Sequence, residues 1–212
     1  MTGSGTVAQR TYGGRSAADR RAERRERLFS AGLDLFGTEG YATASIEKLC
    51  THAGVSTRNF YEEFAGREDL LIALHTRIIE HSFQAVIAAF DGAADAPMRE
   101  RFERAVRAFV TTTASDPRWA RLSYVEVIGV SDKVERHRIA WRERWADFLV
   151  AEAERAVARG EASQRDFRLS AVALIGAVNE LVHHYSISGG RSSLDDVIAE
   201  FVRLAIATVV TP

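Results

Sequence analysis

The sequence predicts an all-α protein in which three short N-terminal helices precede a body of six helices. From Ser16 almost to the end, apolar residues recur every three or four positions, the spacing of an amphipathic helix. No stretch shows the alternation of apolar and polar residues that is typical of a half-buried strand. Only 3 of the 212 residues are proline, the residue least compatible with a helix interior.

The breaks between helices are marked by the residues that start and stop them, with Ser and Asp as N-caps and Gly as C-cap. A capping box with Asp in place of Glu, over residues 163–166, is expected to open the eighth helix. The nine expected helices span roughly residues 17–38, 45–53, 56–64, 66–89, 102–113, 117–128, 131–160, 163–187 and 193–208. The expected domains are a flexible arm over 1–15, a helix-turn-helix domain over 16–66, and a second domain over 67–212.

The composition is that of an ordinary globular protein, with 46% hydrophobic residues, 27% charged residues and a formal net charge of -1. This balance excludes a general polyanion binder, so any nucleic-acid site has to be local. Cys50 is the single cysteine, which excludes an intramolecular disulfide and suits a reducing compartment. The chain lacks a signal-peptide core and an apolar run of ~20 residues, so we expect a cytoplasmic protein without a membrane partner.

The segment that joins the second and third helices has the pattern of a helix-turn-helix. Gly54 can take the positive φ that a tight turn between helices needs, and Val55 supplies the apolar residue beneath it. In such units the second helix enters the major groove of DNA and directs its N-terminal residues toward bases and phosphates.

Several side chains of this second helix suit contacts with double-stranded DNA. Arg58 can form two hydrogen bonds with guanine, and Asn59 can do the same with adenine. Thr57 and Tyr61 carry hydroxyl groups that suit phosphate oxygens. Arg67 opens the next helix, where its charge and the free backbone N–H groups together favour a phosphate contact.

With the helix before it, this stretch resembles the DNA-binding domain of the TetR family. The resemblance covers roughly residues 25–71 and rests on Ala31, Leu35, Phe36, Gly40, Tyr41, Ser45, Ile46, Leu49, Ala53, Gly54, Val55, Ser56, Phe60, Tyr61, Phe64, Arg67, Glu68, Leu70 and Leu71. It implies a homodimer that binds a DNA operator, represses or less often activates nearby genes, and releases DNA when a small-molecule effector fills the C-terminal domain. Position by position, it assigns DNA contacts to Ser45, Thr57, Arg58, Asn59, Tyr61 and Arg67.

Three departures from the family pattern bear on DNA binding. Arg67 stands where lysine is usual, which keeps the charge and changes the hydrogen-bond geometry. Lys48 stands where an acidic residue often completes a capping box. Glu62 and Glu63 bring negative charge to positions near the DNA backbone. They leave open an alternative function, a helical binding module that keeps the fold without sequence-specific DNA binding.

The N-terminal region carries a local excess of positive charge. Residues 10–27 contain seven arginines against three acidic residues. A flexible arm that carries Arg15 can lie in the minor groove beside a helix-turn-helix. Alternatively, these charges form the solvated, salt-bridged start of the first helix, and both interpretations stay open.

Aromatic residues crowd two helices of the body and predict either a ligand pocket or an ordinary core. Trp141 and Trp145, four positions apart, share one helix face. We expect most of these aromatics to be core, with one or two tryptophans also lining a cavity. Asn179 and His183 either contact a ligand or satisfy a dimer interface, and small residues on the last two helices suit close packing across a dimer. The candidate ligand contacts are Trp119, Tyr124, Trp141, Trp145, Asn179 and His183.

Other classes of function lack support in the sequence. It contains no P-loop, dinucleotide glycine pattern, zinc motif of the H-E-x-x-H kind or spaced Ser-His-Asp set, so we expect neither an enzyme nor a cofactor. No trio of the 6 histidines has ligand spacing, so no metal site is expected. The full prediction is an all-α, ligand-responsive DNA-binding regulator, a repressor released from its operator by a small apolar molecule. Its three-helix helix-turn-helix domain would be followed by a six-helix domain for ligand binding and dimerisation.

Overall fold

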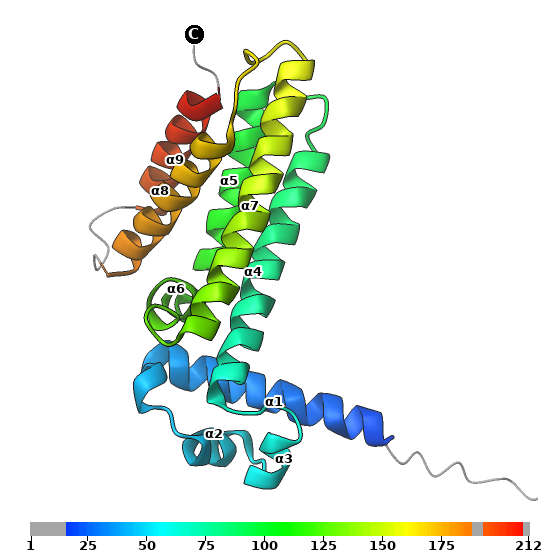
Figure 1. Ribbon diagram of the computed structural model, residues 1–212, viewed down its shortest axis with the longest axis vertical. Helices are drawn as coiled ribbons and strands as arrows, with labels where there is room; N and C mark the ends of the chain where they lie inside the picture. Colours follow the sequence, from blue (N-terminus) through cyan, green and yellow to red (C-terminus); the bar gives the residue numbers. More distant parts are fainter. Residues whose placement is uncertain (1–15, 188–192, 210–212) are drawn as a thin grey trace, which may run out of the picture.

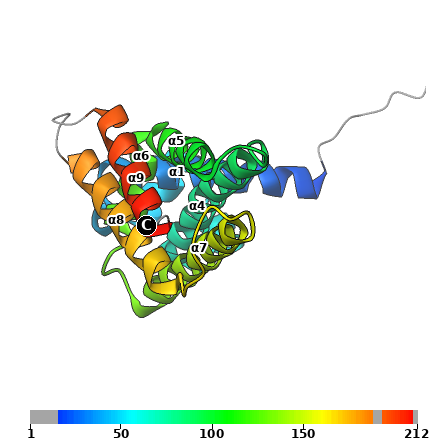
Figure 2. The same ribbon diagram turned by 90° about the horizontal axis from the view of Figure 1, so that it is seen from above.

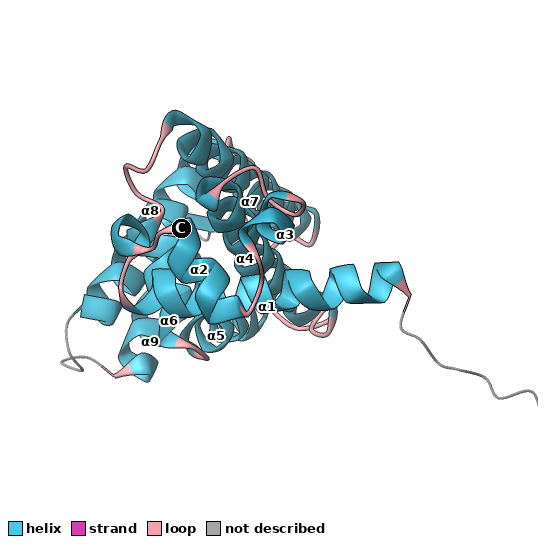
Figure 3. Cartoon of the chain, turned by 90° about the horizontal axis from the view of Figure 1, so that it is seen from below, coloured by secondary structure: helices cyan, strands magenta, loops and turns pink. Residues whose placement is uncertain are grey.

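The computed structural model describes residues 16–187 and 193–209, and over those ranges all regular structure is helical. Figure 3 shows helices joined by loops in this part of the chain, which confirms the all-α prediction. The expected arm, with Arg15, lies outside the described residues. Within the described ranges, none of the helices combines the length and the apolar character that crossing a lipid bilayer requires.

The helices fall into a small N-terminal group and a larger body. The N-terminal group consists of α1 (Ala17–Thr38), a 3-10 turn η1 (Tyr41–Thr43), α2 (Ile46–Ala53) and α3 (Thr57–Tyr61). The body consists of α4 (Arg67–Asp91), α5 (Met98–Ala114), α6 (Pro117–Arg121), a π turn η2 (Leu122–Glu126), α7 (Asp132–Ala158), α8 (Arg168–Ile187) and α9 (Leu194–Val209).

The long helices of the body stand on α1. In Figure 1, α4, α5 and α7 run along the length of the body, and α1 crosses beneath them with α2 and α3 below it. Figure 2 shows α8 and α9 side by side on one flank, and α9 also packs against α5. The N-terminal half of α1 extends beyond the body in both views.

Two large apolar clusters hold these parts together. The first joins α1, α2 and α3 to the lower end of α4, with Leu28, Phe36 and Phe60 fully buried. Leu122 and Val127 of the body also belong to this cluster, so the α6–η2 region packs into the core of the N-terminal group. The second cluster fills the space between α4, α5, α7, α8 and α9.

A close approach between α1 and α6 requires a residue without a side chain. A Cβ on Gly37 would lie 2.5 Å from the Cβ of Arg118 and 3.0 Å from its Cα, too close for any other residue without a shift of the backbone. Gly37 therefore lets α6 rest directly on the C-terminal turn of α1.

The expected boundaries differ most from the structure in four helices, of which α5 begins at Met98, four residues before the expected start. The third is shorter than predicted, ending at Tyr61. The sixth helix passes into the π turn η2 after Arg121. The capping box expected at Ser163 does not open the eighth helix, which begins at Arg168 because Asp166 Oδ1 accepts a hydrogen bond from the Arg168 N–H at 2.8 Å.

Candidate DNA-binding and ligand-binding sites

The turn between α2 and α3 has the geometry of a helix-turn-helix. Gly54 adopts φ 59° and ψ 42°, and its N–H donates to the carbonyls of Cys50 and Thr51. Ser45 caps α2 by accepting from the Lys48 N–H at 3.2 Å, and Ser56 caps α3 in the same way. Serine hydroxyls thus fix the start of both short helices.

The predicted DNA contacts of α3 lie together on one exposed face. Phe60 is buried against the N-terminal core, and this fixes the rotation of the helix. The Arg58 side chain is 90% exposed, Tyr61 is 54% exposed, and Thr57 is exposed as well. Asn59 is half-buried beside them. The face opposite the core therefore carries two hydroxyls, an amide and a guanidinium.

Arg67 lies between the backbone of η1 and the start of α4. Its Nη1 donates to the carbonyls of Tyr41 at 3.2 Å and Ala44 at 3.0 Å, and its guanidinium lies over the Tyr41 ring at 4.6 Å. A guanidinium carries five N–H donors, so these bonds leave others for a phosphate. Arg67 thus helps to hold η1 on α4, a role that the sequence did not indicate.

Glu63 turns away from the exposed face of α3 and lies against α1. Its side chain is fully buried, and it accepts hydrogen bonds from Arg24 Nη2 at 2.9 Å and Arg21 Nε at 3.2 Å. Burial opposes ionisation of this carboxyl, but the hydrogen bonds from Arg24 and Arg21 outweigh it and lower the pKa of Glu63. Of the two glutamates questioned above, Glu62 alone stays exposed.

Several arginines of α1 contact the helix-turn-helix. Arg25 Nη1 donates to the Glu63 carbonyl at 3.4 Å, and its guanidinium lies 4.5 Å from the centre of the Phe64 ring. Arg27 Nη1 donates to the Gly54 carbonyl at 3.2 Å. Arg21, Arg24 and Arg25 form ion pairs with Glu63, as the salt-bridged alternative expects, whereas Arg27 is held by a backbone carbonyl. The minor-groove role of Arg15 stays a prediction, because that residue lies outside the described ranges.

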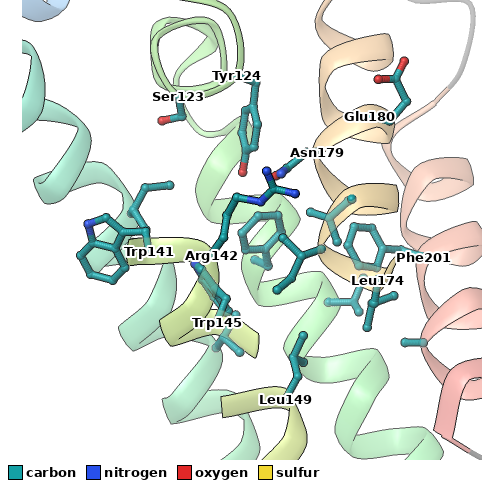
Figure 4. A pocket seen from close by; sticks show the side chains of 18 of the residues that line it. Ser123, Tyr124, Trp141, Arg142, Trp145, Leu149, Leu174, Asn179, Glu180 and Phe201 are labelled. Atoms are coloured by element: carbon teal, nitrogen blue, oxygen red, sulfur yellow. The ribbon is translucent and has the colours of Figure 1, made fainter. Parts of the chain in front are cut away.

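The body contains a cavity of about 450 Å³ between α4, α5, α7, α8 and α9, with η2 at one end (Figure 4). This volume lies in the range of roughly 300–1,000 Å³ that is usual for small-molecule sites. Most of its wall is apolar and includes Val86, Phe102, Phe109, Leu149, Leu174 and Phe201.

Five of the six predicted ligand contacts line this cavity: Tyr124, Trp141, Trp145, Asn179 and His183. Trp119 does not, because α6 directs it toward the N-terminal core, where its ring meets the edge of His81 with ring centres 5.5 Å apart. Trp145 also packs against Phe83, with ring centres 4.7 Å apart. Trp141 and Trp145 therefore pack in the apolar core and also line the cavity.

Sequence reasoning missed several polar residues of the cavity, namely His75, Ser123, Arg138 and Arg142. Arg142 follows Trp141 and precedes Trp145 by three positions, so the helical repeat that grouped the tryptophans could have pointed to it. Ser123 lies in the π turn, where the ordinary helical spacing fails.

The α6–η2 region, which lines the cavity, also forms polar contacts with the N-terminal group. Arg118 forms an ion pair with Asp34 of α1. Arg121 Nη1 donates to the Thr38 carbonyl at 2.6 Å, and Glu126 Oε2 accepts from the Tyr41 N–H at 2.8 Å. A movement of η2 therefore reaches the last turn of α1 directly.

Known proteins share this architecture. The fatty acid degradation regulator FadR from Bacillus halodurans has 19% identity and a TM-score of 0.75, over 86% of this chain and 94% of that one. FadR from Bacillus subtilis, solved in complex with stearoyl-CoA, has 18% identity and a TM-score of 0.74, over 87% of this chain and 98% of that one. At these identities the likeness concerns the fold.

A curated relative is more similar in sequence over a shorter stretch. The HTH-type transcriptional activator FasR of Mycolicibacterium smegmatis is 30% identical over 118 residues, 55% of this chain and 53% of that protein. The matched region thus spans about half the length of this relative.

Family models match both parts of the chain. Residues 28–74 match the model of bacterial regulatory proteins of the tetR family, and residues 95–209 match that of the tetracyclin repressor-like C-terminal domain. The first match contains the helix-turn-helix, and the second contains most of the cavity wall. The chain therefore belongs to the TetR family, whose members are DNA-binding transcription regulators and not enzymes.

Proposed function

We propose that this regulator is a homodimeric repressor that leaves its operator when an apolar small molecule occupies the cavity of the body. One observation carries the proposal: η2 lines the cavity with Ser123 and Tyr124, and Glu126 holds it to η1 of the N-terminal group. An effector in the cavity therefore contacts the same segment that supports the DNA-binding group.

The walls of the cavity favour an effector with a long apolar part. Burial of alkyl groups stabilises a complex by about 0.8 kcal/mol for each CH₂, and the wall offers phenylalanine, leucine and tryptophan side chains to such a chain. The Bacillus subtilis relative, bound to stearoyl-CoA, supports an acyl chain as the occupant. The effector proposed here is accordingly an acyl-chain compound.

The exposed face of α3 supplies the contacts with the operator in this proposal. Arg58 and Asn59 contact base edges, and Thr57 and Tyr61 contact phosphates, with Ser45 and Arg67 at the flanks. The dimer, acting in the cytoplasm, presents its two recognition helices about 34–36 Å apart to successive major grooves. A shift of α4 and η2 on effector binding changes this separation and weakens the complex.

Fluorescence anisotropy on DNA from upstream of the protein's own gene tests the proposal. We expect tight binding with a steep dependence on salt, because phosphate contacts release counterions. The double variant Arg58→Ala, Tyr61→Ala should bind at least about tenfold more weakly, since a good base contact contributes about 1–3 kcal/mol. The matched control Arg99→Ala changes an arginine of α5, outside the helix-turn-helix, and should bind as the wild type does.

The same assay with dodecanoate and dodecanoyl-CoA tests the response to ligand. Release of the operator DNA by either compound supports a repressor. Tighter operator binding would instead indicate an activator-type response, and FasR is named a transcriptional activator. Equal, weak binding to operator and unrelated DNA would favour the alternative of a module that keeps the fold without sequence-specific binding.

A further inference from the structure

Hydrogen-bonding groups gather at one end of the cavity. Ser123 and Tyr124 reach this end from η2, Arg142 reaches it from α7 and Asn179 from α8 (Figure 4). Four labelled side chains farther along the cavity are apolar: Trp145, Leu149, Leu174 and Phe201. The cavity therefore has one polar end and one apolar end, which match the two ends of an amphiphilic ligand.

Within the described ranges, Ser123 carries a buried hydroxyl without a hydrogen-bond partner. The residue is 5% exposed, and its Oγ forms no hydrogen bond within the described part of the chain. Leaving a buried polar group unsatisfied costs free energy, and native proteins rarely do so without a ligand or water to complete the bond. Ser123 lines the cavity, but its Oγ exposes less than 1 Å² and points away from Arg142 in Figure 4, so a ligand atom can accept this hydrogen bond once the side chain changes rotamer.

Among the residues that the structure describes, Arg142 is an exposed cation without a counter-ion at the same end. Other arginines of α7 are paired, Arg138 with Glu135 and Arg144 with Glu80. Arg142 forms no ion pair or hydrogen bond among residues 16–187 and 193–209. In Figure 4 its guanidinium extends toward Tyr124 and Asn179.

The charges at this end favour an anion. Glu180 also lines the cavity, but its carboxylate points away from the guanidinium of Arg142 in Figure 4, and no ion pair joins them. Burial raises the pKa of Tyr124, so its phenol stays protonated and able to donate. A guanidinium, a serine hydroxyl, a phenol and an amide can together donate to the oxygens of one carboxylate.

We propose that the effector is a fatty acid with a free carboxylate, held by Arg142 and by hydrogen bonds from Ser123, Tyr124 and Asn179. Its alkyl chain lies along the apolar wall toward Leu174. This inference rests on the proposed function and adds the head-group chemistry to it. The head contacts η2, the segment bonded to η1, so an uncharged alkyl compound of equal length should be a weaker effector.

Tryptophan fluorescence provides the binding assay, because Trp141 and Trp145 line the cavity. The probes are dodecanoate, its methyl ester and dodecanoyl-CoA, each titrated into the full-length protein. We expect the wild type to bind dodecanoate at least about tenfold more tightly than the ester, as hydrogen bonds to a charged group contribute that much. The variant Arg142→Met should lose this preference and still bind the ester.

Two further variants separate head-group recognition from damage to the fold. Ser123→Ala should bind dodecanoate severalfold more weakly and the ester unchanged. Arg136→Met removes an exposed arginine of the same helix that does not line the cavity, and it should behave as the wild type does. Partial recovery of dodecanoate binding in Arg142→Lys would show that the charge itself is recognised.

Three results would overturn the inference. If the wild type binds dodecanoate and its ester with equal affinity, an apolar effector is still supported but recognition of a carboxylate is not. If dodecanoyl-CoA binds more tightly than dodecanoate and Arg142→Met does not change its affinity, the head group of the effector is a thioester. Failure of all three probes to bind would remove both the carboxylate and the acyl-chain effector of the proposed function.

Discussion

Glu63 shows how a single side chain can decide the interpretation of a recognition helix. In sequence it lies beside Glu62 and adds negative charge at the expected DNA face. In the structure its carboxylate is buried beneath α1 and paired with Arg21 and Arg24. Glu63 therefore holds the N-terminal half of α1 close to α3, and its negative charge does not lie on the exposed face of α3.

Replacement of Glu63 by glutamine should destabilise the protein by about 1–3 kcal/mol, because the mostly buried guanidinium of Arg24 loses its charged acceptor. Hydrogen exchange should also become faster in the N-terminal half of α1. Chemical denaturation and hydrogen–deuterium exchange measure the two effects. The matched control Glu62→Gln changes an exposed neighbour and should stay within about 0.5 kcal/mol of the wild type. Equal stabilities of the two variants would contradict the role of Glu63.

His75 is a second residue whose surroundings determine its chemistry. It is buried on α4, and its Nδ1 lies 3.0 Å from His137 Nε2 on α7. Burial, followed by repulsion from His137 and Arg138, lowers the pKa of His75 from 6.5 to about 3. Since the folded protein keeps this imidazole neutral, acid favours the unfolded chain, which can bind the proton.

The free energy of unfolding should therefore decrease as the pH is lowered from 6.5 to about 3. Between pH 7.5 and pH 5.0, protonation of His75 in the unfolded chain lowers the free energy of unfolding by about 2 kcal/mol. His75→Gln should lose less stability than the wild type does between these two pH values, as measured by urea unfolding. The control His52→Gln alters an exposed histidine and should follow the wild type. A parallel fall in His75→Gln and wild type would exclude this histidine as the cause.

At the scale of elements, the α6–η2 region connects the two parts of the protein. One side of it supplies Ser123 and Tyr124 to the cavity, and Leu122 and Val127 enter the N-terminal core. The π turn puts an additional residue into this segment. Its polar bonds to α1 and η1 end at Thr38 and Tyr41, at the base of the DNA-binding group.

Weakening this connection should uncouple the two binding events. Glu126→Gln keeps the shape of the side chain and removes the charge that holds the Tyr41 N–H and Arg121. We expect operator affinity and dodecanoate affinity to stay near those of the wild type, while the effect of dodecanoate on operator affinity falls severalfold.

Anisotropy titrations with and without dodecanoate measure this coupling. Glu103→Gln, an exposed carboxylate of α5 outside the cavity lining, is the matched control and should keep the full response. If Glu126→Gln responds to dodecanoate as fully as Glu103→Gln does, the coupling runs through another contact.

At the scale of the molecule, α8 carries exposed apolar side chains on the flank that it forms with α9. Leu169 is 81% exposed and Val172 is also exposed, which is unusual for a helix that faces solvent. Small residues on α8, such as Ala173 and Ala177, allow a second helix to approach closely. These features support a homodimer built on α8 and α9.

A charge on this flank should therefore split the dimer. We expect Val172→Glu to shift the protein to a monomer and to weaken operator binding strongly, because two half-sites no longer act together. Sedimentation velocity measures the mass, and anisotropy measures the affinity. Ile139→Glu, at an exposed apolar residue of α7, is the matched control and should stay dimeric. A dimeric Val172→Glu would move the interface away from this face.

The sequence alone determined the features that depend on neighbouring residues along the chain. Helical periodicity predicted the all-α fold, and Ser45, Ser56 and Gly54 predicted the starts of the short helices and the turn between them. These are local effects, and they act over one or two helical turns.

Only the tertiary structure decided which distant residues meet. Trp119 and Trp141 are both tryptophans on helices, yet the packing of α6 on α1 takes the first out of the cavity. The burial of Glu63 depends on arginines about 40 positions away. That Arg142 and Ser123 find no partner among the described residues depends on how α7 packs beside η2. Periodicity places a residue on a face of its own helix, but long-range packing selects what that face meets, and so decides the chemistry of the cavity.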